Sequence, residues 1–174
     1  MQIKIEQDIK SIGCDILVVN QFEGEKTTEE IANKYAIEED NFEGKYGQTY
    51  LLPTYGKENA RKILVLGLGK KEELTTDKFR IAIYKAIKKT IQMKAKKVGF
   101  NLTDIGFDWA EQFAYGCYIA DYSFDKYKTK KDDKIDEIYV NCNEANLRKA
   151  EIIAQGMKLT RDLANEPAMY ATPE

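Results

Sequence analysis

The chain of 174 residues contains no histidine, which limits the chemistry that it could perform. Ser-His-Asp and Cys-His catalysis, zinc sites with His ligands and a His general base are all excluded. Cys14, Cys117 and Cys142 are far apart in the sequence, and each lies in or beside an apolar stretch. We therefore expect reduced packing residues rather than disulfides or a structural zinc site.

A turn with two glycines, Leu66 to Lys70 (LGLGK), is the candidate ligand-binding site in the sequence. A strand-to-helix turn of this kind can hold an anion against the amide groups of a helix N-terminus. The third glycine of GxGxxG is absent, however, and GxxxxGK[ST] does not occur. We therefore expect mainly a tight turn after a buried strand, and Gly67, Gly69 and Lys70 are the residues that would contact a phosphate ligand.

Charged side chains supply no catalytic or metal-ligating candidate. Adjacent carboxylates at 38–40 and 132–133 are expected to be surface charge, because a two-metal site needs carboxylates that converge from separate strand ends. Lysines gather at 85–97 and 126–131, but the net charge is −2 and acidic neighbours are frequent. Nucleic acid is therefore not an expected partner. An accessory contact through Lys126, Lys128, Lys130 and Lys131 stays open as an alternative.

The hydrophobic pattern predicts strands that alternate with helices. Strands are expected at 2–7, 14–20, 47–56, 61–69, 97–102 and 135–141, and helices at 27–40, from Thr75 or Thr76 to about residue 91, at 108–122 and at 143–167. Pro53 indicates that the strand at 47–56 lies at a sheet edge. Phe79, Ile83, Ala86, Ile87 and Ile91 form one apolar stripe of a helix.

This alternation is typical of an α/β domain with a helix-covered, largely parallel mixed sheet. We expect one compact domain over 1–143 and a connecting helix and linker over 144–174. The last helix carries Leu147, Ala154, Met157 and Leu163, which we expect to form one stripe that further protein covers in part. The N-terminus lacks a secretory signal and no apolar run approaches membrane-spanning length, so we expect a cytoplasmic protein.

Three stretches, in this order and spacing, resemble the leucine aminopeptidase (cytosol aminopeptidase) family of metallo-exopeptidases. They are KILVLGLGKKEELTTDKFRIAI (Lys62 to Ile83), GCYIADYSFDKYKTKK (Gly116 to Lys131) and LTRDLANEPAMYATPE (Leu159 to Glu174). The last stretch resembles the linker of that family, in which a helix end and an asparagine-x-proline turn lead into the catalytic domain.

The resemblance implies an N-terminal domain similar in fold to macro domains, followed by a catalytic domain with two divalent metal ions, zinc or manganese, and a hexameric assembly that hydrolyses peptides. The signature stretches with the metal ligands do not occur in these 174 residues, so no catalytic or metal-binding residue is assigned here. The main hypothesis is a non-catalytic scaffolding domain of a leucyl aminopeptidase. The alternative is a free-standing macro-like module that binds ADP-ribose or another phosphate ligand.

Overall fold

The structure is a computed structural model of the chain, and it describes residues 1–25, 42–102, 105, 109–142, 144–167 and 169–170. The helix expected at 27–40 and the carboxylates at 38–40 lie outside these residues. Within the described residues, six strands form one sheet in the order β1-β6-β5-β2-β4-β3. The strands are β1 (Gln2–Ile5), β2 (Ile16–Phe22), β3 (Thr49–Pro53), β4 (Lys62–Gly69), β5 (Lys97–Phe100) and β6 (Glu137–Val140).

All neighbouring strands are parallel except β3, which pairs antiparallel with β4 at one edge. The largely parallel mixed sheet and the edge position of the strand with Pro53 are confirmed. Pro53 is acceptable there because an edge strand does not need every amide as a donor. The α/β fold expected from the sequence is present.

The strands β2 and β4 bury side chains on both faces of the sheet. Leu64, Leu66 and Leu68 of β4 belong to the main core, beneath the helices. Ile63 and Val65, on the opposite face, pack in a second cluster with Leu17 of β2. This two-sided burial explains why both strands are continuously apolar in the sequence.

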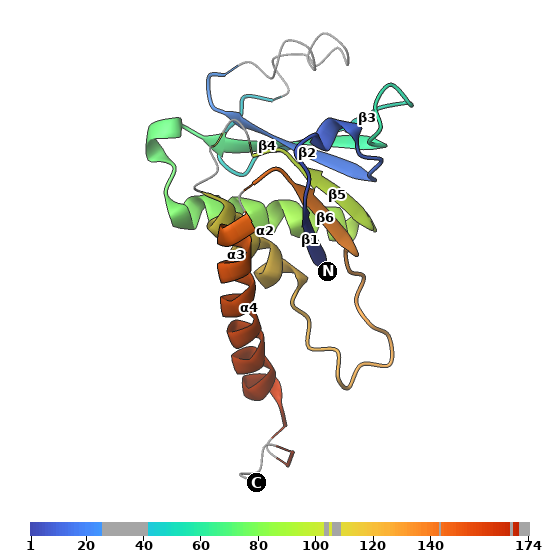
Figure 1. The fold of residues 1–174 in the computed structure, drawn as a ribbon, viewed down its shortest axis with the longest axis vertical. Helices are drawn as coiled ribbons and strands as arrows, with labels where there is room; N and C mark the ends of the chain where they lie inside the picture. The colour runs from blue at the N-terminus through green and yellow to red at the C-terminus, as the bar shows by residue number, and fades with distance from the viewer. Residues whose placement is uncertain (26–41, 103–104, 106–108, 143, 168, 171–174) are drawn as a thin grey trace.

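Three α-helices follow in the described part of the chain: α2 (Thr76–Gln92), α3 (Ala110–Asp121) and α4 (Glu144–Asn165). Helices α2 and α3 lie together against one face of the sheet (Figure 1). The hydroxyl of Thr75 caps α2 by accepting a hydrogen bond from the backbone N–H of Lys78 at 3.2 Å. No helix in the described residues is both long and apolar enough to cross a membrane.

Helix α2 packs tightly against α3. The predicted stripe of α2 is confirmed, because Phe79, Ile83, Ala86 and Ile87 are fully buried and Ile91 is partly buried against the same core. A Cβ atom at Gly116 of α3 would lie 2.9 Å from both the carbonyl oxygen of Arg80 and the Cβ of Ile83. The missing side chain at Gly116 therefore permits the close approach of the two helices.

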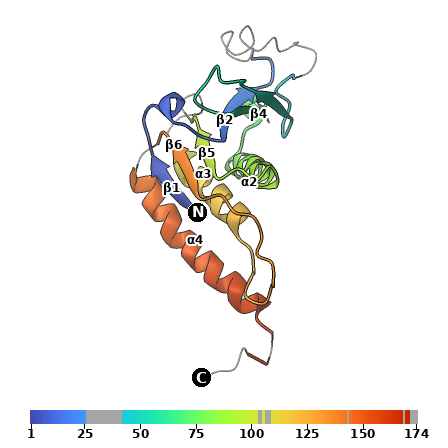
Figure 2. The ribbon, with the colours of Figure 1, turned by 90° about the vertical axis from the view of Figure 1, so that its right-hand side faces the viewer.

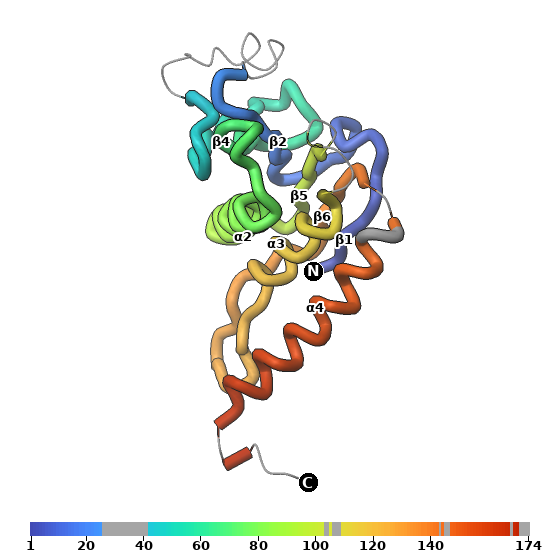
Figure 3. Tube along the Cα trace, turned by 90° about the vertical axis from the view of Figure 1, so that its left-hand side faces the viewer, coloured from blue at the N-terminus to red at the C-terminus, as the bar shows by residue number. Residues whose placement is uncertain are grey.

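Helix α4 runs beside α3 and then continues beyond the sheet (Figures 2 and 3). Its buried residues Ala150 and Ala154 face α3, and Ala150 packs against Ala114 and Tyr115 of that helix. Leu147 packs there as well, but Leu163 is nine residues from Ala154 and therefore lies on the opposite side of the helix. The single stripe expected from Leu147, Ala154, Met157 and Leu163 is wrong, because these residues divide between two faces.

Two glycine substitutions test the packing of α2 against α3. We expect Gly116→Ala to lower the free energy of unfolding by about 1–3 kcal/mol, because the added methyl group forces the helices apart. Gly156→Ala is the matched control in α4, where an added Cβ meets nothing within 4 Å. It should raise the free energy by up to about 1 kcal/mol. Urea denaturation measures both, and equal effects would contradict this account.

Candidate functional site

The glycine turn at the end of β4 is occupied by a neighbouring segment of the chain. The amide N–H of Gly67 donates to the carbonyl oxygen of Gln48 at 2.8 Å, and that of Gly69 donates to the carbonyl oxygen of Gly44 at 2.9 Å. A Cβ at Gly67 would lie only 2.3 Å from the carbonyl oxygen of Lys45. The two glycines therefore allow the segment 44–48 to approach β4, and their amides already have acceptors.

The third residue of this candidate site, Lys70, lies exposed on the surface next to the turn. Its ammonium group is 3.7 Å from the carboxylate of Glu73. The structure thus places Gly67 and Gly69 in the last part of strand β4, packed against the segment 44–48, and Lys70 outside this contact. A phosphate ligand at these three residues stays a prediction, and it could not use the two glycine amides as they are placed here.

The basic segment 126–131 is interleaved with carboxylates. The ammonium group of Lys126 lies 2.7 Å from Glu166, and that of Lys128 lies 2.7 Å from Asp132 and 3.3 Å from Asp125. These contacts assign Asp132 to surface charge, as the sequence predicted. Half of the four lysines named for an accessory nucleic-acid contact are therefore engaged in ion pairs, and that contact stays a prediction.

All three cysteines are buried and free, which confirms that they are packing residues. Burial raises the pKa of the Cys142 thiol to about 11 and that of the Cys117 thiol well above its usual value. Both thiols therefore stay protonated and unreactive near neutral pH. Among the residues that the structure describes, no group of three or more His, Cys, Asp or Glu side chains could hold a metal ion.

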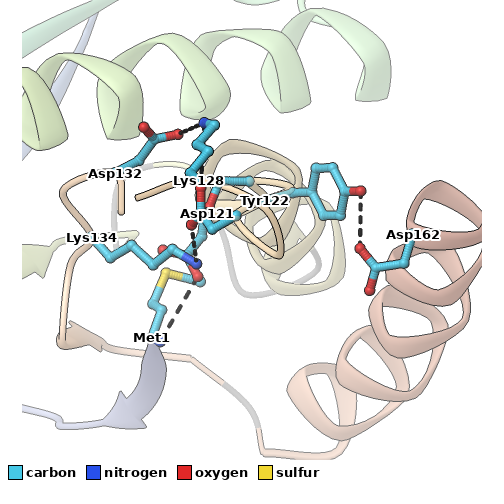
Figure 4. Close-up of polar contacts among 9 residues, drawn as sticks. Met1, Asp121, Tyr122, Lys128, Asp132, Lys134 and Asp162 are labelled. Carbon is cyan, nitrogen blue, oxygen red and sulfur yellow. Dashed lines mark hydrogen bonds and ion pairs between the residues drawn. The ribbon is translucent and has the colours of Figure 1, made fainter. Parts of the chain in front are cut away.

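A cleft of about 260 Å³ lies between α3 and α4. Tyr115, Tyr118 and Asp121 line it from α3, and Ala154, Lys158 and Arg161 line it from α4. Burial, with a smaller contribution from Glu151, raises the pKa of the Tyr118 phenol to about 12. The carboxylate of Asp121 lies 3.8 Å from the amino group of Met1 at the base of β1 (Figure 4).

Tyr122 follows α3 directly and connects it to the far half of α4. Its phenol donates to the carboxylate of Asp162 at 3.0 Å, as Figure 4 shows, and accepts from the side-chain amide of Asn165 at 3.2 Å. The guanidinium group of Arg161 lies over the Tyr122 ring, 4.4 Å from its centre. One aromatic side chain thus contacts three residues in the last two turns of α4.

The loop after Tyr122 also contacts the residues that follow α4. Glu166 accepts hydrogen bonds from Lys126, at 2.7 Å, and from the phenol of Tyr127. The Tyr127 ring also stacks on Tyr170 with 5.7 Å between the ring centres. We call this set, Tyr122, Lys126 and Tyr127 with Asp162 and Glu166, the α4 clamp. It can orient the helix, and nothing in its geometry activates a nucleophile.

The α4 clamp was not found in the sequence, where 126–131 was noted only as a group of lysines. Its partners are about 40 residues apart along the chain, as for Tyr122 with Asp162 and Lys126 with Glu166. No local spacing indicates such a contact. The regular interleaving of tyrosines and lysines with acidic residues near a helix end is the one sequence signal that could have indicated it.

Acid should weaken the loop that carries the α4 clamp. A hydrogen bond from Ser123, together with Lys128 and Lys134, lowers the pKa of Asp125 from 3.8 to about 2. A depressed folded-state pKa means that this stabilisation is complete above about pH 4 and is lost as the pH falls towards 2. Urea denaturation between pH 2.5 and 7 should show a shallower acid dependence for Asp125→Asn. Asp133→Asn is the control, and identical pH profiles for Asp125→Asn and the unsubstituted chain would contradict the assignment.

Removal of the Tyr127 side chain tests the α4 clamp itself. We expect Tyr127→Ala to increase amide hydrogen exchange over residues 161–166 by roughly tenfold, which corresponds to a loss of about 1.4 kcal/mol in local stability. Tyr55→Ala, at a side chain that is 86% exposed, is the matched control. Unchanged exchange at the end of α4 in Tyr127→Ala would show that the clamp does not hold the helix.

The chain is similar to known proteins in both sequence and fold. The profile described as "Cytosol aminopeptidase family, N-terminal domain" matches residues 18–131. The probable cytosol aminopeptidase of Alkaliphilus oremlandii (strain OhILAs) is 31% identical, over 99% of this chain and 40% of that protein. The corresponding protein of Clostridium perfringens (strain 13 / Type A) is 32% identical, over 95% of this chain and 37% of that protein. The chain thus spans about two fifths of the length of these curated relatives.

Solved structures agree in fold. A tomato leucine aminopeptidase mutant matches with a TM-score of 0.77 and 16% identity, over 99% of this chain and 40% of that chain. The bottromycin maturation enzyme BotP matches with a TM-score of 0.74 and 22% identity, over 91% of this chain and 34% of that chain. With a profile that matches most of its length, the chain belongs to the cytosol aminopeptidase family and carries the N-terminal domain of that family.

Proposed function

We propose that this chain is the non-catalytic N-terminal domain of a metal-dependent leucyl aminopeptidase, which releases N-terminal amino acids from peptides. Its role is to scaffold and assemble the full-length enzyme. One observation carries the proposal: the region similar to the N-terminal domain of the family, residues 18–131, is followed by a long helix that is clamped at its far end and projects beyond the sheet. Residues 1–143 form the domain, and 144–174 form the connector.

The carboxylates with shifted pKa values support a structural rather than a catalytic role. Hydrogen bonds from Lys4 and Tyr139, with Lys97 nearby, lower the pKa of Glu137 to about 2. Lys126 and Tyr127 likewise lower the pKa of Glu166. These carboxylates stay ionised in ion pairs within the domain, whereas a general base works best with a pKa near the operating pH.

We assign the two divalent metal ions, zinc or manganese, to the catalytic part that lies beyond the matched region in the relatives. The described residues of this chain do not fit such a site, because no group of three or more His, Cys, Asp or Glu side chains that could hold a metal ion occurs among them. One structure of the similar enzyme BotP is a complex with manganese, which is in keeping with a metal-dependent family. Assembly into a homo-oligomer, a hexamer by resemblance to the family, and a cytoplasmic location complete the proposal.

Activity measurements on two lengths of polypeptide test this function. The purified 174-residue chain should not hydrolyse leucine p-nitroanilide above the blank with added Mn²⁺ or Zn²⁺. The full-length gene product should hydrolyse it and lose the activity with a chelator. Chelator-sensitive turnover that follows the 174-residue chain through purification would refute a non-catalytic role. An inactive full-length product, with metal present and peptides also offered, would refute the aminopeptidase assignment.

A further inference from the structure

The face of α4 that points away from α3 carries a second set of apolar residues. Ile152, Leu159 and Leu163 are 65%, 61% and 63% exposed. With about 100° of rotation per residue, they and Gly156 fall within an arc of roughly 60°. We call Ile152, Gly156, Leu159 and Leu163 the outer stripe of α4.

The two faces of α4 differ in side-chain size. The side towards α3 carries one large aliphatic residue, Leu147, beside the small buried residues Ala150 and Ala154, whereas the outer stripe carries three large aliphatic side chains. A surface helix normally turns its larger apolar residues to the core and its polar residues to solvent. An exposed row of large apolar residues on a helix marks a contact surface.

Gly156 gives an independent indication that something approaches the outer stripe. It lies in the middle of a helix of 22 residues, where glycine is less stable than alanine. A Cβ at this position would meet no atom within 4 Å, so packing within this domain does not require glycine. Glycine between large apolar neighbours on a helix lets a second backbone or a bulky side chain come close.

We propose that the outer stripe is the surface on which the catalytic part of the polypeptide packs against this domain. This inference rests on the proposed function and adds the surface that joins the two parts. In the curated relatives the matched N-terminal region makes up only 37–40% of the protein, so the larger part of each relative lies beyond the match.

The fixed orientation of α4 also favours this occupant over a second copy. Tyr170, which follows α4, stacks on Tyr127 on the clamped flank, whereas Met169 is 74% exposed. The α4 clamp holds the opposite flank of the helix through Tyr122 and Glu166. The outer stripe is therefore held in a fixed orientation on the flank that this domain leaves exposed.

Cysteine labelling tests the proposal with little background, because the three native cysteines are buried. Leu159→Cys should react with a maleimide in the 174-residue chain about as fast as Tyr55→Cys, whose exposed position follows the edge strand β3. In the full-length gene product, Leu159→Cys should react at least about tenfold more slowly, while Tyr55→Cys keeps its rate. Equal slowing of both variants, or of neither, would overturn the proposal.

Two further readouts separate the alternatives. If the 174-residue chain sediments as a dimer that Leu159→Glu converts to a monomer, the outer stripe joins two copies and the proposal is wrong. Aminopeptidase activity of the full-length product is measured on the same samples. Activity without protection of residue 159 refutes the docking surface and leaves the proposed function intact. Protection without activity supports the docking surface and refutes the proposed function.

Discussion

The pairing of β2 with β4 is the contact on which the remaining elements depend, since both strands bury apolar side chains on both faces. Their parallel register, from Ile16 opposite Lys62 to Asn20 opposite Leu66, holds the most apolar runs of the chain at the centre of the sheet. Strands buried on both sides need cover on each face, and parallel neighbours need crossover connections. The crossovers from β4 through α2 to β5 and from β5 through α3 to β6 cover one face. Ile9, Phe42 and Ala60, from segments outside these helices, cover the central strands on the other face.

Both crossovers step in the same direction across the sheet, which puts α2 and α3 on the same face when each is right-handed. The two helices must then share one layer, and Gly116 provides the space for their contact. Once α3 is fixed, its other side offers Ala114 and Tyr115, against which Ala150 of α4 is buried. The position of the first half of α4 thus follows from the sheet through two successive helix contacts.

Sequence patterns were sufficient for the elements whose side chains alternate or repeat locally. Continuous apolar runs indicated β2 and β4, and the spacing from Phe79 to Ile91 indicated the buried side of α2. Contacts between distant segments could not be predicted in this way. Two such contacts depend on how separate parts of the chain meet. Residues 44–48 approach Gly67, and Tyr122 and Lys126 contact the end of α4. The periodicity of α4 predicted a helix but not which side would face α3, because apolar residues occur on both sides.

The energetics of α4 explain why its far half has two kinds of contact. Ion pairs and hydrogen bonds of exposed groups, such as Lys126 with Glu166, contribute only about 0–1 kcal/mol each, so they define an orientation more than they stabilise the helix. Full burial of one large aliphatic side chain contributes about 1.5–3 kcal/mol. Burial of Ile152, Leu159 and Leu163 would therefore stabilise α4 more than the contacts of the clamp do. In the domain alone these three side chains stay largely exposed, so this stabilisation is absent. A helix oriented by polar contacts on one flank, with its apolar residues free on the other, is prepared to be buried by a second body without having to be reoriented first.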